Sequence, residues 1–310
     1  LCLTCHGDKE GLVAEKAVDR MPYVHGVIAG EGCVICHDPH ATDQQFMLKK
    51  PINQLCSGCH PGIAAQTGGH PLPNHPVAAP WERLRPGRAL TCSSCHDPHG
   101  NPSFRLLYGA GTTHAGVTFT ADAPVADGIS IFFGAESPSN HTAYQSGVSG
   151  WCGNCHGAYH DGAGSGFEHP GGQSLGMGSS NRYNRYNGDD DPIGGSWETA
   201  YLAAVPIEDP SATTGSTTGA SSTSRVTCLT CHRAHASSAP HAGRWDFNVS
   251  LLREDGVASG SWPIPDPFGS PNQGPLCGKC HSGLPGGGSG SPDDGRVPTV
   301  ELDSVSGGAP

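Results

Sequence analysis

The chain has 310 residues and a formal net charge of −11, with 46 Gly and 27 Pro but only 35% hydrophobic and 6% aromatic residues. The acidic balance argues against nucleic acid or an anionic membrane as partner, and no run of about 18 apolar residues is present to span a bilayer. This composition approaches that of a disordered chain, so another apolar body must supply much of the core.

One motif, Cys-x-x-Cys-His, recurs along the whole chain and uses all 14 cysteines. Two thiols on one turn of chain reach the two vinyl groups at one edge of a porphyrin, and the next residue supplies the fifth ligand of the iron. The pattern therefore predicts seven covalently attached haem c groups. The copies are Cys2, Cys5 and His6; Cys33, Cys36 and His37; Cys56, Cys59 and His60; Cys92, Cys95 and His96; Cys152, Cys155 and His156; Cys228, Cys231 and His232; and Cys277, Cys280 and His281.

Two other uses of paired cysteines fit the sequence poorly. A zinc ribbon needs two such knuckles for each metal, and seven knuckles cannot pair off. A disulfide scaffold is denser in Cys than this chain, and a bridge that closes a loop of two residues constrains almost nothing. Because residue 1 stands directly before a motif Cys and no signal-peptide pattern precedes it, we expect a processed, mature form.

The sixth iron ligands are expected among the histidines outside the motifs. Seven of the 18 His belong to motifs, which leaves 11, whereas the chain has only three Met, Met21, Met47 and Met177. We therefore predict bis-His, low-spin, low-potential haems. His114 and His241 rank lowest on position. The candidate distal ligands are His25, His40, His70, His75, His99, His141, His160, His169 and His235.

The expected fold is mostly irregular coil with short helices and little strand, wrapped around a linear stack of seven haems. In chain order we expect a short helix at each motif, some strand at 117–120 and 129–133, and an exposed Ser/Thr-rich loop at 211–224. The expected division is a four-haem module at 1–108, a three-haem module at 109–281 and an extended Gly/Ser/Pro-rich tail at 282–310, in which 297–302 packs.

An internal repeat marks the first module. Cys33 and Cys92 each begin a Cys-x-x-Cys-His-Asp-Pro-His stretch that leads to an aromatic and aliphatic group near Phe46 and Phe104. Repeated units of this kind stack on one another when none buries its apolar face alone. The two Asn sequons at Asn140 and Asn248 are read as chance matches or glycosylation sites, and the acidic run 189–191 as a solvated turn or, as the alternative, a Ca²⁺ site.

The stretch from Cys2 to Phe104 resembles the doubled modules of multihaem c-type cytochromes, in its paired motifs, in His25 ahead of Cys33, and in its two Asp-Pro-His tails. The later part, with Trp-Cys-Gly-Asn-Cys-His at 151–156, is similar to large secreted multihaem cytochromes, some of which polymerise into extracellular filaments, or nanowires. The resemblance implies haem attachment outside the cytoplasm, a continuous haem stack and electron transport.

The leading functional hypothesis is therefore an electron conduit without catalytic residues. Motifs near both ends of the chain favour head-to-tail self-association into a filament at the cell surface or outside the cell, with other cytochromes or extracellular acceptors as redox partners. Two alternatives stay open. One is a monomeric shuttle or metal reductase, in the periplasm or at the surface, and the other is a multihaem oxyanion reductase, which would need an exchangeable sixth position.

Overall fold

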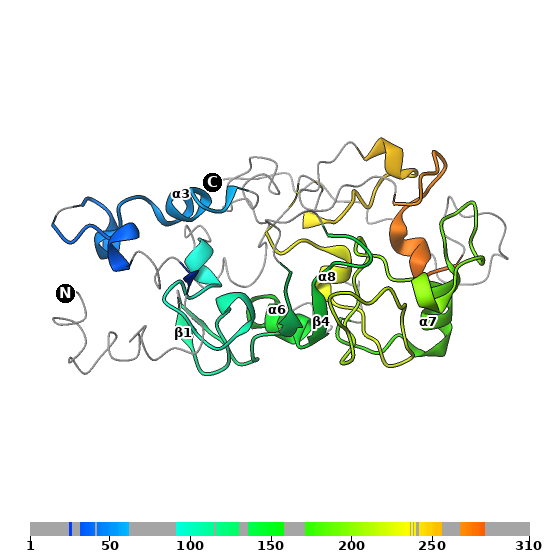
Figure 1. The fold of residues 1–310 in the computed structure, drawn as a ribbon, viewed down its shortest axis with the longest axis horizontal. Coiled ribbons are helices and arrows are strands. Elements are labelled where there is room, and N and C mark those ends of the chain that lie inside the picture. The colour runs from blue at the N-terminus through cyan, green and yellow to red at the C-terminus, as the bar shows by residue number, and fades with distance from the viewer. Residues whose placement is uncertain are drawn as a thin grey trace, which may run out of the picture.

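The computed structural model describes residues 25–26, 32–40, 42–61, 91–114, 116–129, 136–157, 171–235, 237, 239, 242–255 and 267–282. In Figure 1 the segment 32–61 lies toward one end of the long axis, α6 (Val148–His156), β4 (Ala143–Ser146) and α8 (Cys228–Cys231) lie in the middle, and α7 (Gly176–Arg185) and 267–282 lie toward the other end. Most described residues are irregular, which confirms the expected fold class. No helix in the described ranges has both the length and the apolar character of a membrane span.

The helices are short, and most of those at the motifs are single turns. Isolated helices of this length are marginal in water, so tertiary packing must hold them. The α-helices are α3 (Ile52–Ser57), α6 (Val148–His156), α7 (Gly176–Arg185) and α8 (Cys228–Cys231), and the 3-10 turns are η2 (Cys33–Ile35), η3 (Gln45–Met47), η5 (Cys92–Ser94), η6 (Phe104–Leu106), η9 (Trp197–Thr199), η11 (Leu252–Glu254) and η12 (Leu276–Lys279).

Two small antiparallel sheets lie near the middle of the described chain. β1 (Thr113–His114) pairs with β2 (Val117–Thr118), and β3 (Val125–Asp127) pairs with β4 (Ala143–Ser146) through a register shift. β2 confirms the first half of the strand expected at 117–120. Residue 129 is coil, and residues 130–133 lie outside the described ranges.

Helix α6 shows how the chain positions a motif. Gly147 has φ +88°, in the left-handed region that glycine enters without strain, and it turns the chain from β4 into α6. The buried carboxylate of Glu208 then accepts the backbone N–H of Val148 at 3.1 Å. This bond satisfies a donor that the first turn leaves open and places a negative charge at the helix N-terminus. The helix ends on the motif residues Cys152, Cys155 and His156.

Within the described ranges, two side-chain cores lie beside the fourth to seventh motifs. The larger one contains Tyr183, Leu202, Val205, Trp245, Leu252 and Leu276, and Cys231, Cys277 and Cys280 pack against it. The smaller one contains Tyr108, Val117 and Phe119, with Trp151 and Cys155 packed on it. By contrast, η2 and α3 contain no buried residue. The cysteines at the edge of each core mark where a covalently attached apolar group would extend it.

One loop fold recurs after three motifs, whereas the sequence indicated only the copies that begin at Cys33 and Cys92. In each copy the residue after the motif His donates its N–H to a loop carbonyl, and the loop returns an N–H to the second Cys carbonyl. The motif His bridges the residue that closes the loop: His37 with Leu48, His96 with Leu107, and His232 with Gly243. In the first loop Asp38 donates to Met47 and Lys49 donates to Cys36. In the second, Asp97 donates to Leu106 and Tyr108 to Cys95, and in the third, Arg233 donates to Ala242 and Arg244 to Cys231.

The backbone explains why the third copy follows the same path with a different sequence. Met47, Leu106 and Ala242 occupy the same place in the three loops and all have positive φ, between 55° and 58°. Polar side chains from different residue types make the same bond across the loop: Thr42 to the Leu48 carbonyl, Asn101 to that of Leu107, and Ser237 to that of Gly243.

Two loop expectations need correction. Segment 211–224 lacks helix and strand as expected, yet it is not wholly exposed, because Ala220 lies in the larger core and Ser224 is fully buried. The acidic run 189–191 is not simply solvated either. Asp189 accepts hydrogen bonds from Tyr186 and Gly274, and Asp190 accepts one from Ser270. The expected tail segment 297–302 lies outside the described residues, and the three-part division of the chain stays a prediction.

Candidate haem attachment sites

Six of the seven motifs lie in the described ranges, and in each the two cysteines lie within one helical turn and form no disulfide. A turn of this size places residues one and four on the same side of the backbone, which a single porphyrin edge requires. The motif containing Cys2 and His6 lies outside the described residues. The backbone N–H of the motif His is bonded to the carbonyl of the first Cys at His37, His60, His96, His232 and His281.

Two motif histidines are held in the form that binds a metal. Nδ1 of His37 lies 2.9 Å from the Phe46 carbonyl, and Nδ1 of His96 lies 2.8 Å from that of Arg105. A carbonyl accepts a hydrogen bond only from a protonated nitrogen, so Nδ1 carries the proton and Nε2 keeps its lone pair. Burial also lowers the pKa of His96, which favours the neutral ring.

Each of three motif histidines faces a second histidine from another part of the chain. The ring centres of His37 and His99 are 6.2 Å apart and the planes are 18° from parallel. For His96 and His235 the corresponding distance between ring centres is 6.1 Å and the angle between the planes is 21°. His25 and His60 are 5.9 Å apart with planes at 88°.

These spacings fit one iron between two rings. Two metal–nitrogen bonds of about 2 Å, plus about 1 Å from each nitrogen to its ring centre, give a separation of roughly 6 Å. Nδ1 of His25 is also buried without a hydrogen-bond partner in the described part of the structure. A buried ring nitrogen left in this way is costly unless a ligand or metal satisfies it.

The same joint connects motifs three and four and motifs five and six. In the first, the Asn53 side chain, three residues before Cys56, accepts the backbone N–H of Cys92 at 3.0 Å. In the second, the Ser149 hydroxyl, three residues before Cys152, accepts the backbone N–H of Cys228 at 3.2 Å. The paired motifs are thus held side by side, with α3 against η5 and α6 against α8.

The sulfur atoms of each pair also meet. A hydrogen bond between the Cys56 and Cys92 thiols raises the pKa of Cys56 and lowers that of Cys92 to about 7. A bond from Cys228 likewise raises the pKa of Cys152, and burial adds to the effect. Because each first cysteine would carry its own porphyrin, these contacts bring two attachment edges together at each joint.

Comparison with known proteins agrees with this arrangement. The model of the doubled CXXCH motif family matches residues 25–65. C-type cytochrome OmcS of Geobacter sulfurreducens is 28% identical over 64% of this chain and 63% of its own length. Multiheme cytochrome MtrA of Shewanella baltica is 26% identical over 33% of this chain and 25% of its own. The chain is similar to multihaem c-type cytochromes over about two thirds of its length.

A solved structure is also similar to this chain. The structure of OmcS nanowires from Geobacter sulfurreducens, determined by cryo-EM, matches with a TM-score of 0.50 and 26% identity, over 62% of this chain and 66% of that one. The chain spans 63% of the length of OmcS in the sequence comparison and 66% of the chain in the nanowire structure.

The other predicted distal ligands divide into two groups. His70, His75, His160 and His169 lie outside the described residues, as does His241. His40 is exposed and lies at the same place in its loop as His99 and His235. The ring of His141 is buried against Tyr201, with centres 3.7 Å apart, and its nitrogens face the carbonyls of Thr142 and Ser216. These contacts occupy both nitrogens of His141, and its role as a ligand stays a prediction.

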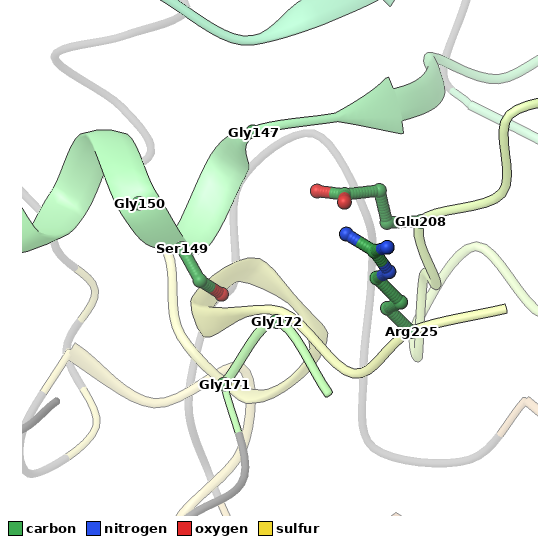
Figure 2. Close-up of a pocket in the computed structure, with 7 residues that line it drawn as sticks. All are labelled: Gly147, Ser149, Gly150, Gly171, Gly172, Glu208 and Arg225. Carbon is green, nitrogen blue, oxygen red and sulfur yellow. The ribbon is translucent and has the colours of Figure 1, made fainter. Parts of the chain in front are cut away.

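A cavity of about 310 Å³ lies beside the joint of α6 and α8. Figure 2 shows Glu208 and Arg225 facing it from one side, with Ser149 on the other and glycines completing the wall. Glu208 and Arg225 also exchange two backbone hydrogen bonds, of 3.0 and 2.7 Å. No sequence pattern indicated that Glu208, Asn53 or Ser149 positions a motif, because each acts on a segment far along the chain.

Proposed function

We propose that this cytochrome conducts electrons through seven covalently attached haem c groups and assembles head-to-tail into an extracellular filament. Haem iron exchanges one electron between its ferric and ferrous states, with no other bond chemistry. The residues of the chain serve this role by holding each iron, setting its surroundings and joining neighbouring attachment sites.

The observation that carries the proposal is the set of histidine ring pairs. We assign His25 as the distal ligand opposite His60, His99 opposite His37, and His235 opposite His96, because their ring centres lie 5.9–6.2 Å apart. Two strong nitrogen ligands leave an iron no exchangeable position, so the same pairs argue against an enzyme that binds its substrate at iron.

The pairing also links one loop to the next. His99 belongs to the loop of the fourth motif and faces His37 in the loop of the second, and His235 in the loop of the sixth faces His96 in that of the fourth. Each loop thus donates a ligand to the preceding loop. By the same rule, His40 would be the distal ligand of the preceding haem iron in the stack, either in this chain or in a neighbouring subunit.

Filament assembly is supported by the relatives. OmcS is described as forming nanowires, and the cytochrome shares both its fold and more than a quarter of its residues over the matched part. Such filaments arise from head-to-tail contacts whose rotation does not close a ring. By analogy with that relative, the polymer would lie outside the cell and pass electrons to extracellular acceptors.

The decisive experiment combines intact-mass spectrometry with negative-stain microscopy of the purified holoprotein. Seven haem masses per chain together with filaments support the proposal. Persistent monomers at high concentration would favour the alternative of a shuttle or metal reductase. A high-spin ferric signal in the electron paramagnetic spectrum of the untreated protein would instead favour an oxyanion reductase, since it reports an open sixth position.

A further inference from the structure

Three cations surround the cysteines of the last two motifs. Lys279 and Arg182 act electrostatically on the sulfur of Cys280, and Arg244 acts on that of Cys231. No carboxylate is among the groups that act on these two sulfurs. The attachment sites of the sixth and seventh haems therefore share a cationic environment.

Lys279 is the most deeply buried of the three. It stands between the two cysteines of its motif and is 2% exposed. Its ammonium group donates to the Tyr186 carbonyl at 2.9 Å and lies 4.5 Å from the centre of the Tyr183 ring. Neither partner carries a formal charge, so no hydrogen-bonded anion offsets the ammonium charge of Lys279 inside the larger core, although burial lowers its pKa to about 8.

The two arginines are bound in the same way. Arg182 donates from Nε to the Gly278 carbonyl at 3.0 Å. Arg244 is 5% exposed and donates to the carbonyls of Leu229 and Ala203. The Asp189 carboxylate accepts hydrogen bonds from Tyr186 and from the Gly274 backbone.

The second motif lies in a different environment. The one cation that acts on the Cys36 sulfur is Lys49, whose side chain is exposed. Neither η2 nor η3 contains a buried residue. Water and salt screen an exposed charge, whereas a buried charge acts through a medium of low dielectric constant.

We propose that Lys279, Arg182 and Arg244 raise the midpoint potentials of the haems at the sixth and seventh motifs above those of the other haems in the chain. These two haems would then form the electron-accepting end of the haem stack. The ferric state carries one more positive charge than the ferrous state. Buried cations therefore disfavour the ferric state, and so does burial itself. Electrons entering elsewhere in the chain would collect at this end.

This inference rests on the proposed function, and its test separates the two. Spectroelectrochemical titration at neutral pH would compare the wild-type holoprotein with the variants Lys279→Gln, Lys279→Arg and Lys49→Gln. Haem number per chain, measured by intact mass, accompanies each titration. A chain with fewer than seven haems in the wild type would contradict the proposed function and not the role of the cations.

We expect Lys279→Gln to lower the midpoint potential of the highest-potential step by about 59 mV, which corresponds to a tenfold change in the equilibrium constant of a one-electron step. Lys279→Arg keeps the positive charge and should therefore leave this midpoint potential unchanged. Lys49→Gln should also leave it unchanged. A full haem count with no shift in Lys279→Gln would overturn the inference. So would an equal shift in Lys279→Arg, because packing rather than charge would then explain it. If Lys279→Gln fails to incorporate haem, Arg182→Gln provides the same readout from outside the motif.

Discussion

The rings of His96 and His235 lie 6.1 Å apart at their centres and are 21° from parallel, although His96 belongs to the fourth motif and His235 follows the sixth. This spacing joins two loops of the same fold through a single candidate iron. It also makes His235 the residue whose loss should be most informative about ligation.

His235→Ala should convert one iron from low spin to high spin, because the ring opposite His96 is removed while both motif cysteines still hold the porphyrin. Electron paramagnetic resonance of the oxidised protein measures the change, and intact mass should show an unchanged haem count. His141→Gln is the control, since both nitrogens of His141 already face carbonyls. A wholly low-spin spectrum for His235→Ala would remove His235 from the ligand set.

Asn53→Ala and Ser149→Ala should each destabilise the holoprotein by about 1 kcal/mol, because a backbone N–H at a motif helix loses its acceptor. Denaturant unfolding followed by circular dichroism measures the loss. Ser57→Ala changes a similar side chain in α3 that bonds only to the preceding turn, and it should have little effect. Equal stability of all three variants would show that the joints do not hold the paired motifs.

Gly243→Ala should destabilise the third loop by about 1–3 kcal/mol, although Leu48 and Leu107 occupy the equivalent positions in the other two. A Cβ at residue 243 would lie 2.5 Å from the Trp245 carbonyl and 2.9 Å from the Phe247 ring. Gly215→Ala is a matched control, because its Cβ would meet its nearest atom at 3.9 Å. Thermal unfolding of both variants would test the difference, and an undisturbed Gly243→Ala would mean that 242–247 repacks freely.

Asp209→Asn should destabilise the protein at neutral pH but not in acid. Partial burial acts to raise the pKa of Asp209, yet hydrogen bonds from Ser211, Ser224 and Ser221 outweigh it, so the pKa lies below its usual 3.8. A depressed carboxyl pKa contributes stability above the unfolded value, and that contribution is lost as pH falls through the folded value.

Unfolding temperatures of wild type and Asp209→Asn, measured between neutral pH and about pH 3, should therefore converge in acid. The loss at neutral pH should be on the order of 1 kcal/mol or less, because Asp209 is only half-buried. Asp122→Asn, at an exposed position, should follow wild type throughout. A constant gap between Asp209→Asn and wild type at every pH would show that the carboxylate charge is not responsible.

The sequence by itself predicted covalently bound haem c, its candidate attachment residues and the similarity to multihaem c-type cytochromes. It did so because Cys-x-x-Cys-His acts within one helical turn, where spacing along the chain is also spacing in the structure. Composition likewise indicated an irregular fold, since so few apolar side chains cannot build regular layers. The two similar loops at Cys33 and Cys92 were predictable for the same local reason.

The tertiary structure alone decided which histidine faces which, that Asn53 and Ser149 join the motifs in pairs, and that a third loop shares the fold without its sequence. It also placed Ala220 and Ser224 inside, although their segment is polar. Each of these depends on where distant segments pack. Chain spacing carries no information about that, because a ring nitrogen, a hydroxyl or a buried lysine finds its partner only after the loops have folded against one another.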